Sequence, residues 1–196
     1  LLKFQTPVSI EYEMAGFIRR LQGDKALFFQ NVPGYDMPVA ANLLVSPANC
    51  EAVFGLDALG IRACMERAIT NPIPPEMVSD APCQEVVITE NIDLGALFPV
   101  LLHAPGDAGR YITSGIIIVR DPETGVYNAS YHRLQLHGGN RTGIQIDVGR
   151  HLGVAFEHAR QLGKPLEIAV ALGPDISVFY AAAFMGAQMP LSADEL

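Results

Sequence analysis

The sequence predicts an α+β protein in which a small N-terminal α/β domain precedes a strand-rich domain. Before the proline-rich segment 71–75, apolar residues recur with helical spacing, as at Ile61, Met65 and Ile69. The prolines interrupt regular structure, because they fix the backbone and remove hydrogen-bond donors. Beyond them, β-branched segments alternate with glycine-containing turns. The predicted domains are residues 1–75 and residues 76–196.

The first domain is predicted to alternate extended and helical segments. Residues 2–10 alternate as an extended chain, and residues 12–21 have the spacing of a short amphipathic helix. Two more strands are predicted over residues 26–29 and 39–45. Two more helices are predicted over residues 49–56 and 59–70.

The second domain is predicted to be built around a hairpin. Asp121-Pro122-Glu123-Thr124-Gly125 has the composition of a hairpin turn. A helix over residues 150–162 ends at Gly163, and residues 94–97 form a shorter helical turn. The predicted strands are residues 83–89, 111–120, 126–136, 142–147 and 166–172, the last of them buried.

Composition excludes several classes of protein. Hydrophobic residues make up 49% and charged residues 17% of the 196 residues, which predicts a folded core. The net charge of −8 and the lack of a basic cluster argue against nucleic-acid binding. Three unpaired cysteines (Cys50, Cys64 and Cys83) are typical of a reducing cytosol. With no secretory leader and no apolar run near the ~18–20 residues of a membrane span, the sequence predicts a cytoplasmic location.

Both ends of the sequence indicate an excised fragment. Residues 1–4 start inside a predicted strand without an initiating methionine. At the other end, Ser192 and Glu195 have the spacing of a helix cap and its third helical residue. The expectation is therefore a piece of a longer protein.

Four polar residues suggest a binding site. Asn128, His151 and Glu195 offer an amide oxygen, an imidazole nitrogen and a carboxylate, a set that suits a divalent metal with room for a phosphate. Arg133 adds a group that binds anions. Each also has an ordinary interpretation: an edge-strand amide, a solvated or capping imidazole, a first-turn carboxylate and a paired arginine. The residues alone leave these alternatives open.

Longer motifs resemble those of a known family. Gly109-Arg110-Tyr111-Ile112-Thr113, the turn at residues 121–125 and the run Asn128-Ala129-Ser130-Tyr131-His132-Arg133 resemble the central region of the UbiD-like decarboxylases. The spacings to His151 and Glu195 also match, and residues 6–8 and 11–13 are similar to the family's N-terminal region. The family uses prenylated FMN and includes 3-octaprenyl-4-hydroxybenzoate and ferulate decarboxylases.

The resemblance implies a split β-barrel domain related to flavin reductases, truncated before a C-terminal domain. It implies that Asn128, His151 and Glu195 bind a divalent metal, typically Mn²⁺, which holds the flavin phosphate. Arg133 would bind the substrate carboxylate, and Arg150 would add a phosphate contact. The residues implied to lie along the flavin are Thr113, Ser130, Tyr131 and His132. A K⁺ site would use the loop with Ala181, Ala182, Ala183 and Met185.

The implied activity is reversible, non-oxidative decarboxylation of an aromatic, heteroaromatic or α,β-unsaturated carboxylic acid. The acid/base glutamates would lie in an E-x-x-x-x-E motif beyond residue 196, a flavin prenyltransferase would supply the cofactor, and the full-length protein would be a homo-oligomer. His132 departs from the small or aromatic residues of relatives, so it has either a substrate-specific role or an ordinary strand position. His137 and His158 are expected to be surface residues.

Two other functions stay open at this stage. The first is a split-barrel module that binds FMN or another phosphate ligand without decarboxylase chemistry. The second is a metallohydrolase that uses His151 and Glu195 and works without a flavin.

Overall fold

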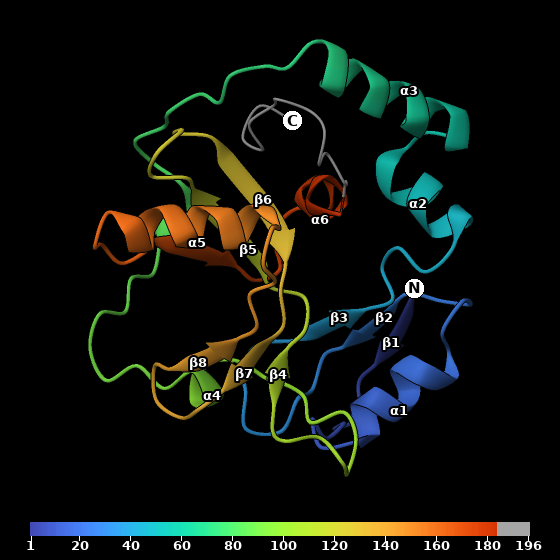
Figure 1. Ribbon diagram of the computed structural model, residues 1–196. Coiled ribbons are helices and arrows are strands. Elements are labelled where there is room, and N and C mark those ends of the chain that lie inside the picture. The colour runs from blue at the N-terminus through green and yellow to red at the C-terminus, as the bar shows by residue number, and fades with distance from the viewer. Residues whose placement is uncertain (184–196) are drawn as a thin grey trace. The chain divides into compact units, whose positions relative to one another are not determined.

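A computed structural model describes residues 1–183 as a mixed α/β fold with small sheets (Figure 1). The chain forms two compact units. The first contains Leu1–Arg62, Val87–Ile112 and Gln135–Gly143, and the second contains Ala63–Val86, Thr113–Leu134 and the chain from Ile144 onward. The chain therefore passes between the units repeatedly, whereas the sequence predicts one boundary at residue 75. That boundary stays a prediction.

The first unit contains a sheet with the order β1-β2-β3. Its strands are β1 (Leu2–Phe4), β2 (Leu27–Phe29) and β3 (Val39–Ala41), with β1 parallel and β3 antiparallel to β2. Helix α1 (Glu13–Arg20) begins where the Ser9 backbone N–H donates to the Glu13 carboxylate at 2.7 Å. This contact satisfies a backbone donor ahead of the helix.

Aromatic side chains hold α1 against this sheet. The Phe29 ring stacks on Phe4 with centroids 4.7 Å apart, and Phe17 of α1 tilts against Phe4 at 4.8 Å. Met14 and Leu27 are fully buried in the same cluster. Such burial of large apolar side chains stabilises each by about 1.5–3 kcal/mol.

A second sheet has the order β4-β7-β8, formed by β4 (Tyr111–Ile112), β7 (Leu134–Leu136) and β8 (Thr142–Ile144). The short helix α4 (Leu94–Leu97) begins at Asp93, whose carboxylate accepts from the Gly95 N–H. The other elements before β4 are helices α2 (Pro47–Phe54) and α3 (Ala58–Thr70) and the 3₁₀ turn η1 (Pro82–Gln84).

The second unit is built on a sheet with the order β6-β5-β9. Strands β5 (Ile116–Arg120) and β6 (Tyr127–Tyr131) form the hairpin, and β9 (Ile168–Ala171) pairs with the other edge of β5. Helix α5 (His151–Gln161) packs on β5 through buried Leu152, Ala155 and Ala159. Helix α6 (Ile176–Ala182) contacts β6.

The structure confirms a mixed fold of helices and small sheets, the helices near residues 12–21, 49–56, 59–70 and 150–162, and the hairpin. It corrects the strand predicted over residues 83–89, because Pro82 starts a 3₁₀ turn and the apolar residues that follow are exposed. The strand over residues 166–172 forms only at Ile168–Ala171, and it is not buried, since Ile168 is 45% exposed.

The two long strands predicted on either side of the turn are each interrupted. The first breaks after Ile112, and the second breaks at residues 132–133. In each case the chain leaves one sheet and enters another, which a pattern of β-branched residues does not reveal. Within residues 1–183 the three sheets form no closed barrel, and the split barrel stays a prediction. In the same part of the chain, every helix is too short or too polar to cross a lipid bilayer.

Candidate functional site

A cavity of about 910 Å³ lies in the second unit, beside β6 and the N-terminal end of α5. Three segments form its wall: the strand residues from Asn128 to His132, the loop from Asp147 into α5, and the end of α6 at Ala182 and Ala183. A cavity of this volume is within the range that binds cofactor-sized ligands.

Strand β6 supplies a row of polar side chains to this cavity. Alternate residues of a strand share one face, which places Asn128 and Ser130 together, and His132 follows directly after the strand. The Asn128 Nδ2 donates to Ser130 Oγ at 3.1 Å, and Ser130 Oγ lies 3.0 Å from His132 Nε2. These hydrogen bonds fix the orientation of the Asn128 amide, so that its Oδ1 is the atom left for other partners.

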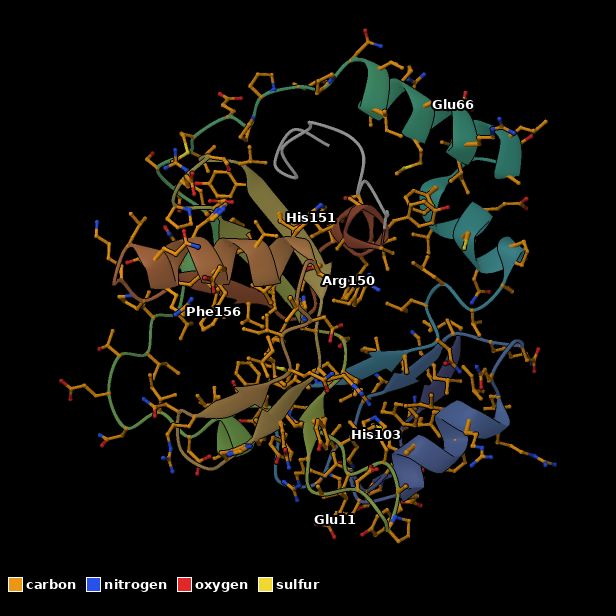
Figure 2. The ribbon with its side chains drawn as sticks, in the orientation of Figure 1. Glu11, Glu66, His103, Arg150, His151 and Phe156 are labelled. Carbon is orange, nitrogen blue, oxygen red and sulfur yellow. The ribbon has the colours of Figure 1, made fainter. Side chains whose placement is uncertain are left out.

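That Oδ1 meets the first residue of α5. His151, labelled in Figure 2, is the first residue of α5. Its Nδ1 lies 2.8 Å from Asn128 Oδ1, and because an amide oxygen only accepts, the His151 ring donates through Nδ1. Neighbouring ligands of an octahedral divalent ion with bonds of about 2.1 Å lie about 3 Å apart. The spacing of this oxygen and nitrogen therefore fits a shared metal ion, which would replace the proton between them.

The N-terminal end of α5 also suits an anion. Arg150 occupies the cap position with an extended backbone, provides no side-chain cap and is followed by no acidic residue in the first turn. The first N–H groups of such a helix lack partners within it, and the helix dipole favours negative charge there. The Arg150 side chain is exposed at the cavity wall and makes no hydrogen bond or ion pair within residues 1–183.

A glycine that sequence reasoning missed lets the cavity loop approach this helix. A Cβ atom at Gly153 would overlap the backbone carbonyl oxygen of Asp147. The loop therefore packs directly on the first turn of α5, and Asp147 itself lines the cavity.

Burial lowers the pKa of His132 below its ordinary value, while the charge of Asp147 and a hydrogen bond to the Gln145 backbone act in the opposite direction.

The last residue of β6, Tyr131, links this strand to α6. The Tyr131 hydroxyl donates to the Phe179 carbonyl at 2.8 Å, and the two rings stack with centroids 6.1 Å apart. Burial raises the pKa of Tyr131. The aromatic contact holds the end of α6, with Ala182 and Ala183, at the cavity wall.

The structure gathers part of the predicted site. It brings Asn128, Ser130, Tyr131, His132, Arg150 and His151 to one cavity. Thr113 and Arg133 are exposed and do not line it. Glu195 and Met185 lie outside the described residues, and within the described part no group of three or more His, Cys, Asp or Glu side chains is placed to hold a metal.

His158 is not the solvated surface residue that the sequence suggested. Its side chain is 23% exposed, and its Nδ1 lies 2.9 Å from both carboxylate oxygens of Asp121. No sequence signal pointed to this pair, because the partners are 37 residues apart.

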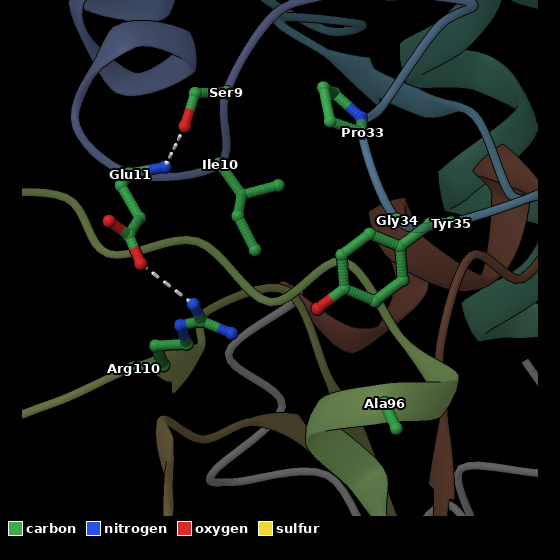
Figure 3. Close-up of a pocket in the computed structure, with 8 residues that line it drawn as sticks. All are labelled: Ser9, Ile10, Glu11, Pro33, Gly34, Tyr35, Ala96 and Arg110. Atoms are coloured by element: carbon green, nitrogen blue, oxygen red, sulfur yellow. Dashed lines mark hydrogen bonds and ion pairs between the residues drawn. The ribbon is translucent and has the colours of Figure 1, made fainter.

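A smaller pocket of about 390 Å³ lies in the first unit (Figure 3). Its charged residues are paired with one another, since Arg110 Nη2 lies 3.0 Å from Glu11 Oε1. The Tyr35 hydroxyl, at the same pocket, donates to the Gly95 carbonyl at 2.7 Å. These polar groups therefore already have hydrogen-bond or ion-pair partners within the protein.

Comparison with known proteins places the whole chain in one family. Residues 76–196 match the 3-octaprenyl-4-hydroxybenzoate carboxy-lyase Rift-related domain, and residues 1–67 match the N-terminal domain of the same enzyme. An uncharacterized protein in the cooM 5′ region of Rhodospirillum rubrum is 34% identical over 100% of this chain and 43% of its own length. The chain therefore spans less than half the length of this relative.

Solved structures agree. The UbiD-class enzyme HmfF from Pelotomaculum thermopropionicum, in complex with FMN, is 38% identical with a TM-score of 0.85, over 92% of this chain and 41% of that one. An evolved dimeric form of HmfF was solved with prFMN. Vanillic acid decarboxylase from Sedimentibacter hydroxybenzoicus, in its closed form, is 27% identical with a TM-score of 0.87, over 99% of this chain and 43% of that one. The chain belongs to the UbiD family of carboxy-lyases.

Proposed function

We propose that the cavity beside β6 and α5 binds the phosphate end of prenylated FMN and that the protein is a reversible, non-oxidative decarboxylase. Its substrate would be an aromatic, heteroaromatic or α,β-unsaturated carboxylic acid. The observation that carries the proposal is the 2.8 Å contact between Asn128 Oδ1 and His151 Nδ1 at the wall of a 910 Å³ cavity. Membership of a family with flavin-bound decarboxylases supports it.

In this proposal each cavity residue has a definite role. Asn128 and His151, with Glu195, would hold Mn²⁺ against the phosphate, and Arg150 with the first N–H groups of α5 would neutralise its remaining charge. Ser130, Tyr131, His132 and Thr113 would lie along the flavin. When bound, the modified flavin supplies the electron sink for the carbanion that decarboxylation leaves.

Arg133 would bind the substrate carboxylate through two parallel N–H donors. The C-terminal end of α6, near Ala181 to Ala183, would offer carbonyl oxygens to K⁺, because the negative end of a helix dipole favours cations. We further propose that the proton donor is a glutamate beyond residue 196 and that the full-length protein is a homo-oligomer. A flavin prenyltransferase would supply the cofactor, and the protein would be located in the cytoplasm.

The test uses the full-length protein produced with and without a flavin prenyltransferase and purified without oxygen. We expect mass spectrometry and absorbance to find prenylated FMN only in the first preparation, together with CO₂ release from a carboxylic acid panel. A protein that carries no modified flavin would contradict the proposal.

One observation favours the alternative of a flavin-binding module without decarboxylase activity. Arg133 does not line the cavity, whereas the groups suited to phosphate do. Bound FMN without CO₂ release from any acid would therefore favour a flavin-binding module. Hydrolysis that continues without flavin would favour a metallohydrolase.

A further inference from the structure

Helix α5 contacts the β5–β6 hairpin through two histidines. His151 Nδ1 lies 2.8 Å from Asn128 Oδ1, and His158 Nδ1 lies 2.9 Å from the Asp121 carboxylate in the hairpin turn. His158 follows His151 by seven residues, which is about two helical turns and places both on one face. The hairpin and the helix are thus joined at two levels along the helix axis.

The second contact rests on a well-ordered anchor. Asp121 Oδ1 accepts from the backbone N–H groups of Glu123 and Thr124 at 2.8 and 3.3 Å, and its side chain is only 14% exposed. The Asp121 backbone N–H also donates a hydrogen bond to the Val126 carbonyl, and the Asp121 carbonyl accepts one from the Gly125 N–H, across the turn. The carboxylate therefore has a fixed position before His158 reaches it. Glu123, which is 3.2 Å from His158 Nε2, is 63% exposed and adds little.

The buried apolar residues of α5 are few and mostly small. Between the two histidine contacts the buried residues are Leu152 and Ala155, and Ala159 follows. They make apolar contacts, and apolar attraction has no direction. The backbone of Asp147 packs on the first turn of α5 at Gly153, and the directional bond from His158 acts further along the helix, where it can set how far α5 extends toward Asn128.

We propose that His158, held by Asp121, is a positioning residue that sets α5 along the hairpin and so keeps His151 Nδ1 within reach of Asn128 Oδ1. The consequence for the cavity is direct, because two atoms that share one metal ion must be placed to within about 0.5 Å. This inference concerns the same cavity as the proposed function.

The first measurement needs no metal. Contact with Asn128 Oδ1 requires the proton of the neutral His151 ring to lie on Nδ1. In metal-free full-length protein labelled with ¹⁵N-histidine, long-range ¹H–¹⁵N spectra identify that tautomer, and the H151Q variant assigns the signal. We expect the Nδ1–H tautomer in the wild type, a shift toward Nε2–H in H158A, and recovery in H158N, because asparagine Nδ2 takes the place of Nδ1.

The second measurement is Mn²⁺ affinity, and it rests on the proposed function. We expect H158A to weaken Mn²⁺ binding on the order of tenfold, as loss of outer-shell support commonly does, and H158N to bind as the wild type. The matched control is R160Q, which breaks the exposed Glu157–Arg160 pair on the same helix and should change neither readout.

The outcomes separate the two proposals. A wild type that binds no Mn²⁺ contradicts the metal site, while the tautomer spectra still decide the role of His158. An unchanged His151 signal in H158A would overturn the positioning role. So would equal effects of H158A and R160Q, or an H158N variant that behaves as H158A does.

Discussion

The pocket beside Arg110 and the cavity beside His151 both present polar side chains to a concave surface, but these side chains have different partners. In the first, Arg110 is paired with Glu11, and the Tyr35 hydroxyl is bonded to a backbone carbonyl. In the second, Asn128 and His151 converge on one point, and Arg150 is exposed beside a helix N-terminus. Polar groups that hydrogen-bond to other protein groups stabilise a fold. Polar groups that point to one place and can still form further hydrogen bonds or metal bonds are suited to a ligand.

The largest expected difference between the two regions is in metal binding. Replacing Asn128 with alanine removes one of the proposed ligands, and we expect Mn²⁺ affinity to fall by about 100-fold or more. The E11Q variant in the other pocket should bind Mn²⁺ as the wild type does. Isothermal titration calorimetry of both variants measures their Mn²⁺ affinities. Equal affinities would contradict a metal site in the cavity.

The next effect concerns the loop packed on α5. The G153A variant places a methyl group against the Asp147 carbonyl, and we expect it to lower the free energy of unfolding by about 1–3 kcal/mol. In the G16A control, the new methyl group in α1 meets no atom within 4 Å, so stability should rise by about 0.5–1 kcal/mol. Denaturant unfolding measures both. A G153A protein as stable as G16A would show that the loop does not pack closely on the helix.

The His158–Asp121 pair should make stability depend on pH. The hydrogen bond to Asp121 raises the pKa of His158 despite partial burial. Burial favours neutral Asp121, but the bonds from His158 and two backbone N–H groups lower its pKa overall. The histidine's contribution is complete below its unfolded pKa of about 6.5 and is lost as pH rises through the raised value. The aspartate's contribution is complete above about 3.9 and is lost as pH falls through the lowered value.

The pair therefore stabilises the fold most between about pH 4 and pH 6.5. Comparing unfolding of the wild type and H158A across pH should show the greatest difference in this window. A difference that does not vary with pH would contradict the charged pair.

The smallest effect is expected in the first pocket. The Arg110–Glu11 pair is 32% and 56% exposed at its side chains, so solvent screens its charges. We expect R110Q to change the free energy of unfolding by less than about 1 kcal/mol and to leave flavin content unchanged. A loss of flavin in this variant would mean that the two regions do not differ as described.

Local patterns in the sequence were sufficient to predict many elements. The spacing of apolar residues predicted α1 and α3, and the run from Asp121 to Gly125 predicted the hairpin, because these signals act over a few residues. The interruptions after Ile112 and at residues 132–133 depend on which sheet each segment joins. That choice is made by distant partners, so local patterns do not reveal it.

The candidate site was likewise predictable in part. The residue types of Asn128 and His151 suggested ligands for a metal, but the meeting of the two side chains was implied only by family resemblance. The roles of Asp147, Gly153 and His158 depend on packing between segments that are distant in sequence. Glu195 lies outside the described residues, and its role as a ligand stays a prediction.

Asn128 and His151 are proposed to hold a metal ion against a flavin phosphate. Pulsed EPR of Mn²⁺ in the flavin-loaded full-length protein can detect both the phosphate and the histidine beside the metal. We expect coupling of the bound Mn²⁺ to ³¹P of the flavin and to a histidine ¹⁴N, with the nitrogen coupling lost in H151A. Flavin-loaded protein whose Mn²⁺ shows no ³¹P coupling, or whose nitrogen coupling persists in H151A, would contradict it.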